Sequence, residues 1–367
     1  MIQSLQSENS SNPSLFDPLI LSRGPAIKNR FILAPLTNTQ SNQDGTLSDD
    51  EYRWLTMRAE GGFGLVTTCA SHVQLNGKAF QGQLGCFSDN HIPGLAKLAS
   101  GIRQAGAVSS LQLQHAGIRA LREQNEILGP SNDPETSARA MSNQEVEDMI
   151  SAFVMAAKRA ELAGFDGIQI HAAHGYVITQ FLSPLLNQRT DHWGGSFDNR
   201  SRLLLEILSK IRAACRPDFQ IGVRISPERF GLRLPEMIEL AQILFNSGKM
   251  DYLDLSLWDI NKEPEDKDFS GQTLASLFIQ LDRGTAKIGL AGKIMSGVDS
   301  AHCLMEGADY VAIGRAAILT HNFPNLLRNN LEFLSPKLPV TADYLRKEGL
   351  GSSFIDYMGS FSGFVSA

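Results

Sequence analysis

The strongest constraint on the fold of this chain is an alternation that repeats eight times: a short apolar run, a loop, then a helical pattern. The apolar runs cover residues 31–35, 64–70, 108–117, 165–175, 219–226, 250–257, 286–292 and 308–315. Strands that are apolar throughout and separated by helices are typical of a parallel sheet that is buried on both faces. Eight such units predict an α/β protein that closes into a (β/α)8 TIM barrel. An open doubly wound sheet is the alternative, weakened because no GxGxxG motif follows the first run.

Helix-start signals lie between these runs. Ser142 and Glu145 form a capping box before the apolar stripe of residues 142–163, and Pro235 suits the first turn of a helix over 235–246. Helical spacing also predicts helices over residues 49–59, 91–104, 199–214, 274–282, 298–305 and 316–329. Two longer connections, 119–141 and 181–197, follow the third and fourth strands. Because barrel enzymes carry their working loops at strand ends, we expect lid insertions there.

Length and pattern predict one barrel with two extensions. Residues 1–14 are polar at their start and lack an apolar segment, so we expect a flexible N-terminal tail. The barrel is predicted over 15–335. Residues 336–367 are predicted to form a C-terminal extension, either packed on the barrel or placed at a subunit contact, and the second arrangement would imply a homo-oligomer.

Composition argues against several classes of protein. The net charge is −6 with no block of like charge, which argues against nucleic-acid binding. The sequence contains no run of about 18 apolar residues, so we predict no membrane span. The four cysteines are scattered without CxxC spacing, which indicates neither an iron–sulfur cluster nor a disulfide framework and fits a cytoplasmic location.

The fourth apolar run ends in an unusual group of side chains. It reads GFDGIQIHAAHGY and places His171, His174 and Tyr176 at or just after a buried strand end. A metal site would explain the histidines, but HxxH lacks an evident third ligand and we predict no metal. The motif is also compatible with histidines that are buried for structural reasons and with a packed tyrosine. The preferred interpretation is two donors that hold a substrate oxygen, with Tyr176 as a general acid.

Other predicted strand ends also carry polar groups. Arg224 lies inside an apolar strand, where it is either paired in a buried salt bridge or a fixed cation facing a ligand that becomes anionic. The turns Ser296-Gly297 and Gly314-Arg315 follow the last two strands, where this fold binds phosphate. Polar groups at so many strand ends would meet at one mouth of the barrel, which predicts a large polar ligand there.

Several long motifs resemble the old yellow enzyme family of FMN-dependent ene-reductases. They follow the family's order over residues 15–330 and read KNRFILAPLTN (28–38), LQLQHAG (111–117), GFDGIQIHAAHGY (164–176), FLSPLLNQRTDHWGGSFDNRSRLLLEI (181–207), IGVRISPE (221–228) and ADYVAIGRAAIL (308–319). The resemblance implies an FMN enzyme that takes hydride from NADH or NADPH. It also implies a small-molecule substrate, an activated alkene whose C=C bond is conjugated to a carbonyl.

The same resemblance implies roles for individual residues. Those expected to line the isoalloxazine ring are Ala34, Pro35, Leu36, Thr37, Ala70 and Gln112, the last at its pyrimidine edge. Arg224 is expected beside N1 and O2 of the flavin, and Ser296, Gly297, Gly314 and Arg315 at its phosphate. His171 and His174 would bind the substrate oxygen, and Tyr176 would donate the proton.

The chain departs from the family at a few positions. Thr39 stands where some members carry a substrate-contacting tyrosine, and Trp193 replaces the commoner tyrosine before Gly-Gly. The acidic segment 256–268 replaces a usual glycine-serine ending and is expected to reshape the substrate mouth. Two further functions stay open: a flavin protein or NAD(P)H:flavin oxidoreductase with another electron acceptor, and a flavin-free barrel lyase. The lyase would need a lysine at a strand end, and the predicted strands show none.

Overall fold

Eight parallel strands close into a barrel in the computed structural model, which describes residues 14–122 and 126–366. Around the barrel the strands follow the order β1-β10-β9-β8-β7-β6-β3-β2. Their bounds are Phe31–Leu33 (β1), Leu65–His72 (β2), Val108–Gln114 (β3), Gly167–Ala172 (β6), Gln220–Ile225 (β7), Tyr252–Ser256 (β8), Lys287–Ala291 (β9) and Tyr310–Ile313 (β10). Each lies within or overlaps one of the eight predicted runs, so the predicted barrel is confirmed. The N-terminal tail predicted for residues 1–14 lies, except for Ser14, outside the described residues.

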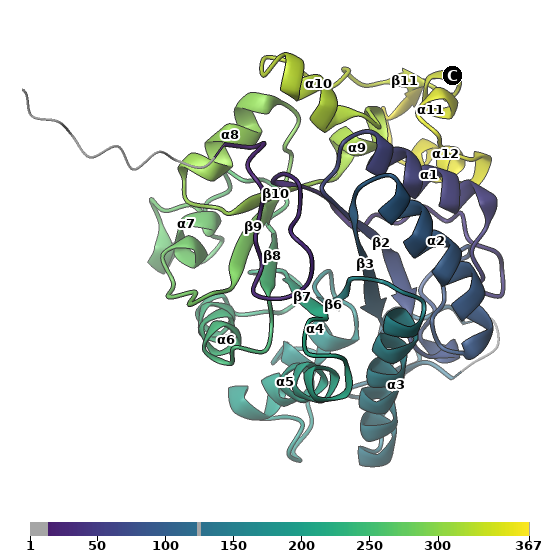
Figure 1. The fold of residues 1–367 in the computed structure, drawn as a ribbon. Coiled ribbons are helices and arrows are strands. Elements are labelled where there is room, and N and C mark those ends of the chain that lie inside the picture. Colours follow the sequence, from purple (N-terminus) through teal and green to yellow (C-terminus); the bar gives the residue numbers. More distant parts are fainter. Residues whose placement is uncertain (1–13, 123–125, 367) are drawn as a thin grey trace, which may run out of the picture.

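Helices surround the strands, as Figure 1 shows. Their bounds are Asp49–Glu60 (α1), Ile92–Gln104 (α2), Asn143–Leu162 (α3), Val177–Leu182 (α4), Phe197–Ala214 (α5), Leu234–Asn246 (α6), Leu274–Ile279 (α7), Gly297–Met305 (α8), Arg315–Leu319 (α9) and Phe323–Asn329 (α10). The capping box of Ser142 and Glu145 is present at the start of α3. The prediction of a single helix over residues 316–329 is wrong. The segment forms α9 and α10 because Pro324, in the first turn of α10, has no N–H to continue a helix from α9.

The two long connections contain little regular structure. After β3 come a short 3-10 turn at Gly117–Arg119 and a small parallel pair, Leu128–Gly129 (β4) with Arg139–Ala140 (β5). Directly after Tyr176, α4 begins, and an irregular stretch connects it to α5. That these segments act as lids stays a prediction.

The amino-terminal end of the barrel, here called the lower end, is filled and hydrogen-bonded. Gly222 and Gly289 leave room for Tyr252 and Tyr310, because an added Cβ would lie about 2 Å from each ring. The hydroxyl groups of both tyrosines have partners, Ser110 Oγ at 3.3 Å and the carbonyl oxygen of Leu253 at 3.0 Å. This end is therefore a packed core.

The C-terminal extension comprises Val340–Thr341 (β11), Ala342–Lys347 (α11), Ser352–Gly359 (α12) and Val365–Ser366 (β12), with β11 and β12 paired in parallel. It lies beside α1 (Figure 1), and the rings of Trp54 and Phe354 are 5.4 Å apart. The Tyr344 hydroxyl donates to the carbonyl of Leu319 at 2.7 Å. The extension thus packs on its own barrel.

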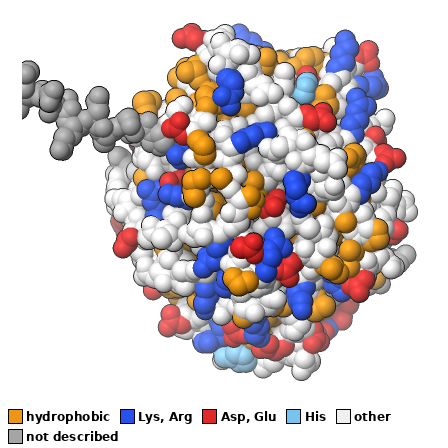
Figure 2. All heavy atoms as spheres, viewed as in Figure 1, with side chains coloured by type: hydrophobic (Ala, Val, Ile, Leu, Met, Phe, Trp, Pro, Cys, Tyr) orange, Lys and Arg blue, Asp and Glu red, His pale blue; other side chains and the backbone are white. Residues whose placement is uncertain are grey.

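Acidic and basic side chains are interspersed on the face shown in Figure 2. Among the described residues, none of the helices has the length and apolar character needed to cross a membrane.

Candidate active site

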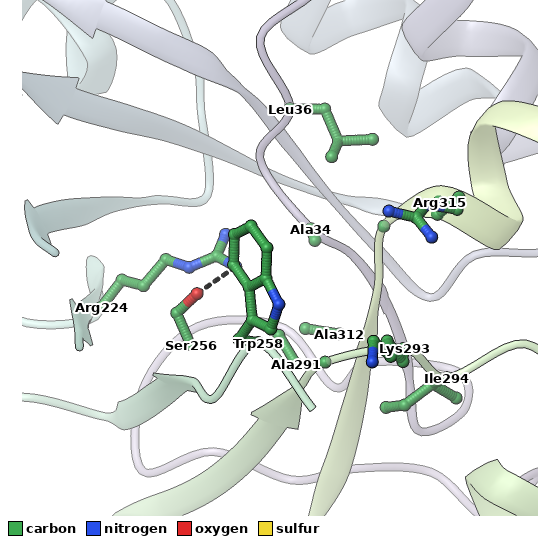
Figure 3. Close-up of a pocket in the computed structure, with 12 residues that line it drawn as sticks. Ala34, Leu36, Arg224, Ser256, Trp258, Ala291, Lys293, Ile294, Ala312 and Arg315 are labelled. Atoms are coloured by element: carbon green, nitrogen blue, oxygen red, sulfur yellow. Dashed lines mark hydrogen bonds between the residues drawn. The ribbon is translucent and has the colours of Figure 1, made fainter. Parts of the chain in front are cut away.

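Two cavities open at the carboxyl-terminal end of the strands, here called the upper end. The larger, of about 770 Å³, is lined by predicted site residues Pro35, Leu36, Thr37, Ala70, Gln112, His171, His174, Tyr176 and Arg315. The smaller, of about 130 Å³, is lined by Ala34, Leu36, Arg224, Gly314 and Arg315 and is drawn in Figure 3. Leu36, Trp258 and Arg315 border both cavities, which are therefore neighbours.

Two predicted phosphate residues lie apart from these cavities. Ser296 and Gly297 border neither of them, and the Ser296 hydroxyl instead accepts from the backbone N–H of Asp299 at 3.0 Å as the cap of α8. The same loop contributes Gly292, Lys293 and Ile294 to the smaller cavity. The sequence indicated the loop, but not which of its residues face the cavity.

His171, near the end of β6, and His174, just after the strand, form a hydrogen-bonded chain. Nδ1 of His171 accepts the backbone N–H of Ala173 at 3.3 Å, which places the His171 proton on Nε2. That nitrogen lies 3.2 Å from Nδ1 of His174, so the His174 proton is on Nε2, 2.7 Å from Oγ of Ser256. The tautomers are assigned from this network. Each ring N–H therefore has an acceptor inside the protein.

Burial determines the protonation of these groups. It lowers the pKa of His174 to about 3, helped by the charges of Arg224 and Arg119, and it lowers the pKa of His171 well below its usual range. At neutral pH both rings are therefore uncharged and carry one N–H each.

Tyr176 lies beside this pair. Its ring meets His171 edge to face at 5.2 Å, and the Arg119 guanidinium lies 4.7 Å above it. Burial raises the pKa of Tyr176, against the opposing charge of Arg119. The phenol is therefore protonated at neutral pH and can donate a proton.

A chain of buried polar side chains crosses the barrel under the larger cavity. Gln112 Nε2 donates to Gln169 Oε1 at 2.8 Å, and Gln169 Nε2 donates to Asp254 Oδ2 at 3.2 Å. Asp254 Oδ2 lies 3.4 Å from Nε of Arg224, which is an ion-pair distance although the geometry is not that of a hydrogen bond. Gln169 and Asp254 were missed from the sequence. Each is a polar residue inside an otherwise apolar strand, and this could have identified them. Gln169 lies two positions before the predicted site residue His171, and Asp254 lies two positions before Ser256.

This charge pair is only partly satisfied. Nε and Nη1 of Arg224 and Oδ1 of Asp254 are buried without a hydrogen-bond partner among the described residues. Burial raises the pKa of Asp254, and Arg224 opposes that shift. Because unsatisfied buried polar groups are costly, the site has hydrogen-bonding capacity that a polar ligand can use.

The loop after β1 is fixed by a buried carboxyl group. Glu51 accepts from Asn38 Nδ2 at 3.1 Å, from Cys69 Sγ at 3.0 Å and from the Ser41 hydroxyl. Burial raises the pKa of Glu51. These contacts hold the segment that carries Ala34 to Thr37 at the cavity wall.

Aromatic residues from three further segments border the larger cavity and were not assigned from the sequence. They are Phe230, Trp258, Tyr357, Phe361 and Phe364. Burial raises the pKa of Tyr357 of α12, and the nearby Thr37 side chain opposes that shift. The two other departures from the family pattern lie elsewhere: Thr39 donates to the carbonyl of Ser353 at 3.0 Å, and Trp193 is fully buried.

Within the described residues, no group of three or more His, Cys, Asp or Glu side chains is placed to hold a metal ion.

Comparisons with known proteins agree with this geometry. Residues 14–333 match the NADH:flavin oxidoreductase / NADH oxidase family. The chain is 36% identical over 322 residues to the probable NADH-dependent flavin oxidoreductase YqiG of Bacillus subtilis (strain 168), covering 84% of this chain and 86% of that one. It is 33% identical over 346 residues to the NADPH dehydrogenase of the same organism, covering 90% and 98%. The structure of Old Yellow Enzyme from Pichia sp. AKU4542 aligns with a TM-score of 0.75 at 27% identity, covering 88% of each chain.

Proposed function

The chain belongs to the NADH:flavin oxidoreductase / NADH oxidase family and is an FMN-dependent NAD(P)H oxidoreductase, and we propose that it reduces the C=C bond of α,β-unsaturated carbonyl compounds with Tyr176 as proton donor. The observation that carries the proposal is the position of Tyr176, whose ring meets His171 edge to face at 5.2 Å and which borders, with both histidines, a cavity large enough for an organic substrate.

The residues at the upper end fit FMN. Arg224 has buried donors without partners, suited to the polar edge of the isoalloxazine ring, and Gln112 borders the same cavity. Gly314 and Arg315 border the smaller cavity and would hold the phosphate, together with Lys293. We assign Ala34 to Thr37 and Ala70 to contact with the ring. Ser296 and Gly297 are proposed only as support for the neighbouring phosphate loop.

When bound, FMN supplies the hydride-transfer chemistry that connects NAD(P)H with the acceptor. The protein's part is to bind, orient and protonate. Arg224 supplies a fixed positive charge in a buried site, where charge stabilisation is strong. Overall, the acceptor gains one hydride at its β-carbon and one proton at its α-carbon, and NAD(P)H becomes NAD(P)+.

His171 and His174 would hold the carbonyl oxygen of the acceptor. In the structure their N–H groups are directed at His174 and Ser256, so a substrate oxygen has to replace at least one of these acceptors. Because each neutral ring carries one N–H, it can donate that N–H to the substrate oxygen in place of its internal acceptor. Polarisation of the carbonyl then makes the β-carbon more electrophilic.

Tyr176 would protonate the α-carbon. Its phenol is neutral before the reaction, and Arg119 above its ring stabilises the phenolate that remains. The guanidinium therefore favours proton release from the phenol.

A second candidate is the same oxidoreductase with an electron acceptor other than an enone. The internal hydrogen bonds of both histidines favour it, because neither N–H is free for a substrate oxygen. The two candidates differ in their substrates.

A visible-absorption titration tests the proposal. The purified protein loaded with FMN is reduced anaerobically with NADPH or NADH, and 2-cyclohexenone is then added. We expect the flavin absorbance to bleach and to return on enone addition, with cyclohexanone as the product. Bleaching without return on enone addition would exclude the ene-reductase proposal and leave the second candidate.

A further inference from the structure

Two loops at the mouth of the larger cavity have unusual backbone conformations. Arg229 and Phe230, after β7, have φ values of 74° and 54°, and Trp258, after β8, has a φ of 69°. Bulky side chains rarely adopt this left-handed region because the Cβ atom approaches the following carbonyl oxygen. Such outliers persist where neighbouring structure holds them, and they concentrate at ligand-binding sites.

The two loops form one connected unit. The Arg229 guanidinium lies 5.0 Å from the Trp258 ring. Glu228 pairs with Lys262 and accepts the backbone N–H of Glu265 at 2.8 Å, which connects the loop after β7 with the segment that follows Trp258. Phe230 packs against Gly175, where an added Cβ would lie 2.8 Å from its ring, so this unit reaches the residue beside Tyr176.

Burial in the protein core does not explain why residues 230 and 258 carry aromatic side chains. Trp258 is 68% exposed and Phe230 39% exposed, yet both border the cavity. Figure 3 draws Trp258 together with Arg224 and Ser256, with which it lines the smaller cavity. Further aromatic residues of the cavity, Tyr357, Phe361 and Phe364, come from the C-terminal extension. None of the described residues that line the cavity is acidic.

From this geometry we propose that Trp258 is a specificity-determining residue that selects acceptors carrying a flat aromatic ring system. The proposal rests on the ene-reductase function proposed above. A flat ring can stack on an indole or meet it edge to face at centroid distances of about 4.5–7 Å, and either arrangement buries apolar surface of both rings. The exposed indole, held in place by Arg229, is a platform for such a ring.

Two enones that differ in one group test the proposal: 4-(2-naphthyl)-3-buten-2-one and 3-penten-2-one, which share the same enone and carry naphthyl or methyl at the β-carbon. We compare kcat/KM for both in the FMN-loaded wild type and in Trp258→Ala and Trp258→Phe. Trp258→Ala is expected to lower the naphthyl-to-methyl ratio about tenfold, whereas Trp258→Phe, which keeps a ring, retains most of it. An unchanged ratio, or an equal fall for both enones, would overturn the proposal.

Binding of the saturated ketones keeps the inference separate from the proposed reaction. 4-(2-Naphthyl)butan-2-one and 2-pentanone are measured by equilibrium dialysis against oxidised holoenzyme, which needs no turnover. If the enzyme reduces neither enone, the ene-reductase proposal fails, and the binding preference for the naphthyl ketone and its loss in Trp258→Ala still decide the role of Trp258. Equal binding by wild type and variant would overturn that role.

Stability distinguishes a ligand platform from a packing residue. Trp258→Gly is expected to melt no lower than wild type, because glycine adopts this φ without strain. Its naphthyl preference should be lost. Ser137→Gly is the matched control, since Ser137 has a φ of 59° and lines neither cavity; it should keep the preference. If the melting temperature of Trp258→Gly fell by several degrees while that of Ser137→Gly did not, Trp258 would be a packing residue and the proposal would be overturned.

Discussion

Two buried aspartates, three residues apart just before and in the middle of β8, show how the ends of the barrel differ. Asp251, at the lower end, is 3.0 Å from Arg23 and 2.9 Å from Arg212, and it accepts the backbone N–H of Ile221 at 2.7 Å. Asp254, toward the upper end, has one amide donor and a loosely placed Arg224, and its Oδ1 has no partner among the described residues.

The difference separates structural from functional polar groups. A buried charge is stable when hydrogen bonds satisfy it, and Asp251 finds all of them within the protein. The polar groups around Asp254 are left incomplete, as in a site that a ligand completes. Substitutions at the lower end should therefore change stability, and substitutions at the upper end should change cofactor properties or turnover.

The largest expected effect comes from comparing two tyrosines. Tyr176→Phe at the upper end should slow reoxidation by an enone about 10²–10⁴-fold, because the general acid is lost, while reduction by NAD(P)H is unchanged. Tyr252→Phe at the lower end should change neither rate and cost about 1 kcal/mol of stability through the lost contact with Ser110. Stopped-flow absorbance follows both half-reactions, and unaltered reoxidation in Tyr176→Phe would remove the proton-donor role.

Removing the charge of Asp251 at the lower end should make the protein easier to unfold without changing its affinity for FMN. Asp251→Asn leaves Arg212 and Arg23 without their anion and should lower the free energy of unfolding by about 3 kcal/mol. Urea denaturation measures this loss. The FMN dissociation constant, measured on the folded protein, should stay within twofold of the wild type. A large change in FMN affinity would contradict the division between the two ends.

The corresponding change at the upper end should act on the cofactor. Asp254→Asn removes a negative charge next to Arg224, which should make uptake of negative charge by the bound flavin easier and raise its midpoint potential by about 30 mV. Spectroelectrochemistry gives the potential, with Asp251→Asn as the control that should not shift it. A potential equal to that of the wild type would show that Asp254 serves only structure.

Acid should weaken the upper end first. Burial lowers the pKa of His72 to about 4 and those of His115 and His174 to about 3, and all three lie at or after the carboxyl ends of strands. Because these pKa values lie below that of an unfolded histidine, about 6.5, the unfolded chain binds more protons at acidic pH. Stability should be fully present above about pH 6.5 and fall as the pH decreases toward 4.

The size of the acid effect can be assigned to a single histidine. His72→Gln should reduce the slope of unfolding free energy against pH by about 1.4 kcal/mol per pH unit in that window. Urea titrations at several pH values measure the slope. Hydrogen exchange should show loss of protection near residues 72 and 115 before residues 221 and 251; the reverse order would contradict the comparison.

The fold could be predicted because its signals are local. Each barrel strand is an apolar run bounded by loops, and the capping box at Ser142 marks a helix start. Arg224 was identified because a charged residue inside an apolar strand is costly without a partner. The break between α9 and α10 was missed because helical apolar spacing continues through Pro324. That spacing predicted one helix, although a proline inside a helical pattern also indicates a break.

The site was harder to predict because its walls come from distant segments. Asp254 and Gln169 were missed because only the barrel register brings them beside Arg224 and Gln112. Trp258 lies in a segment noticed for its acidic residues, and its backbone conformation cannot be inferred from local propensity. Tyr357 comes from α12, and its contact with Thr37 depends on how the extension packs.

The position of the C-terminal extension has a consequence for biosynthesis. Every strand of the barrel and the residues around Arg224 and Arg315 leave the ribosome before Tyr357 and Phe364 do, and chains begin to fold from the N-terminal part during synthesis. The cradle for the cofactor can therefore form while Tyr357, Phe361 and Phe364, which the extension adds to the wall of the substrate cavity, have yet to be made. A nascent chain that has passed α10 is expected to take up FMN before the wall of its substrate cavity is complete.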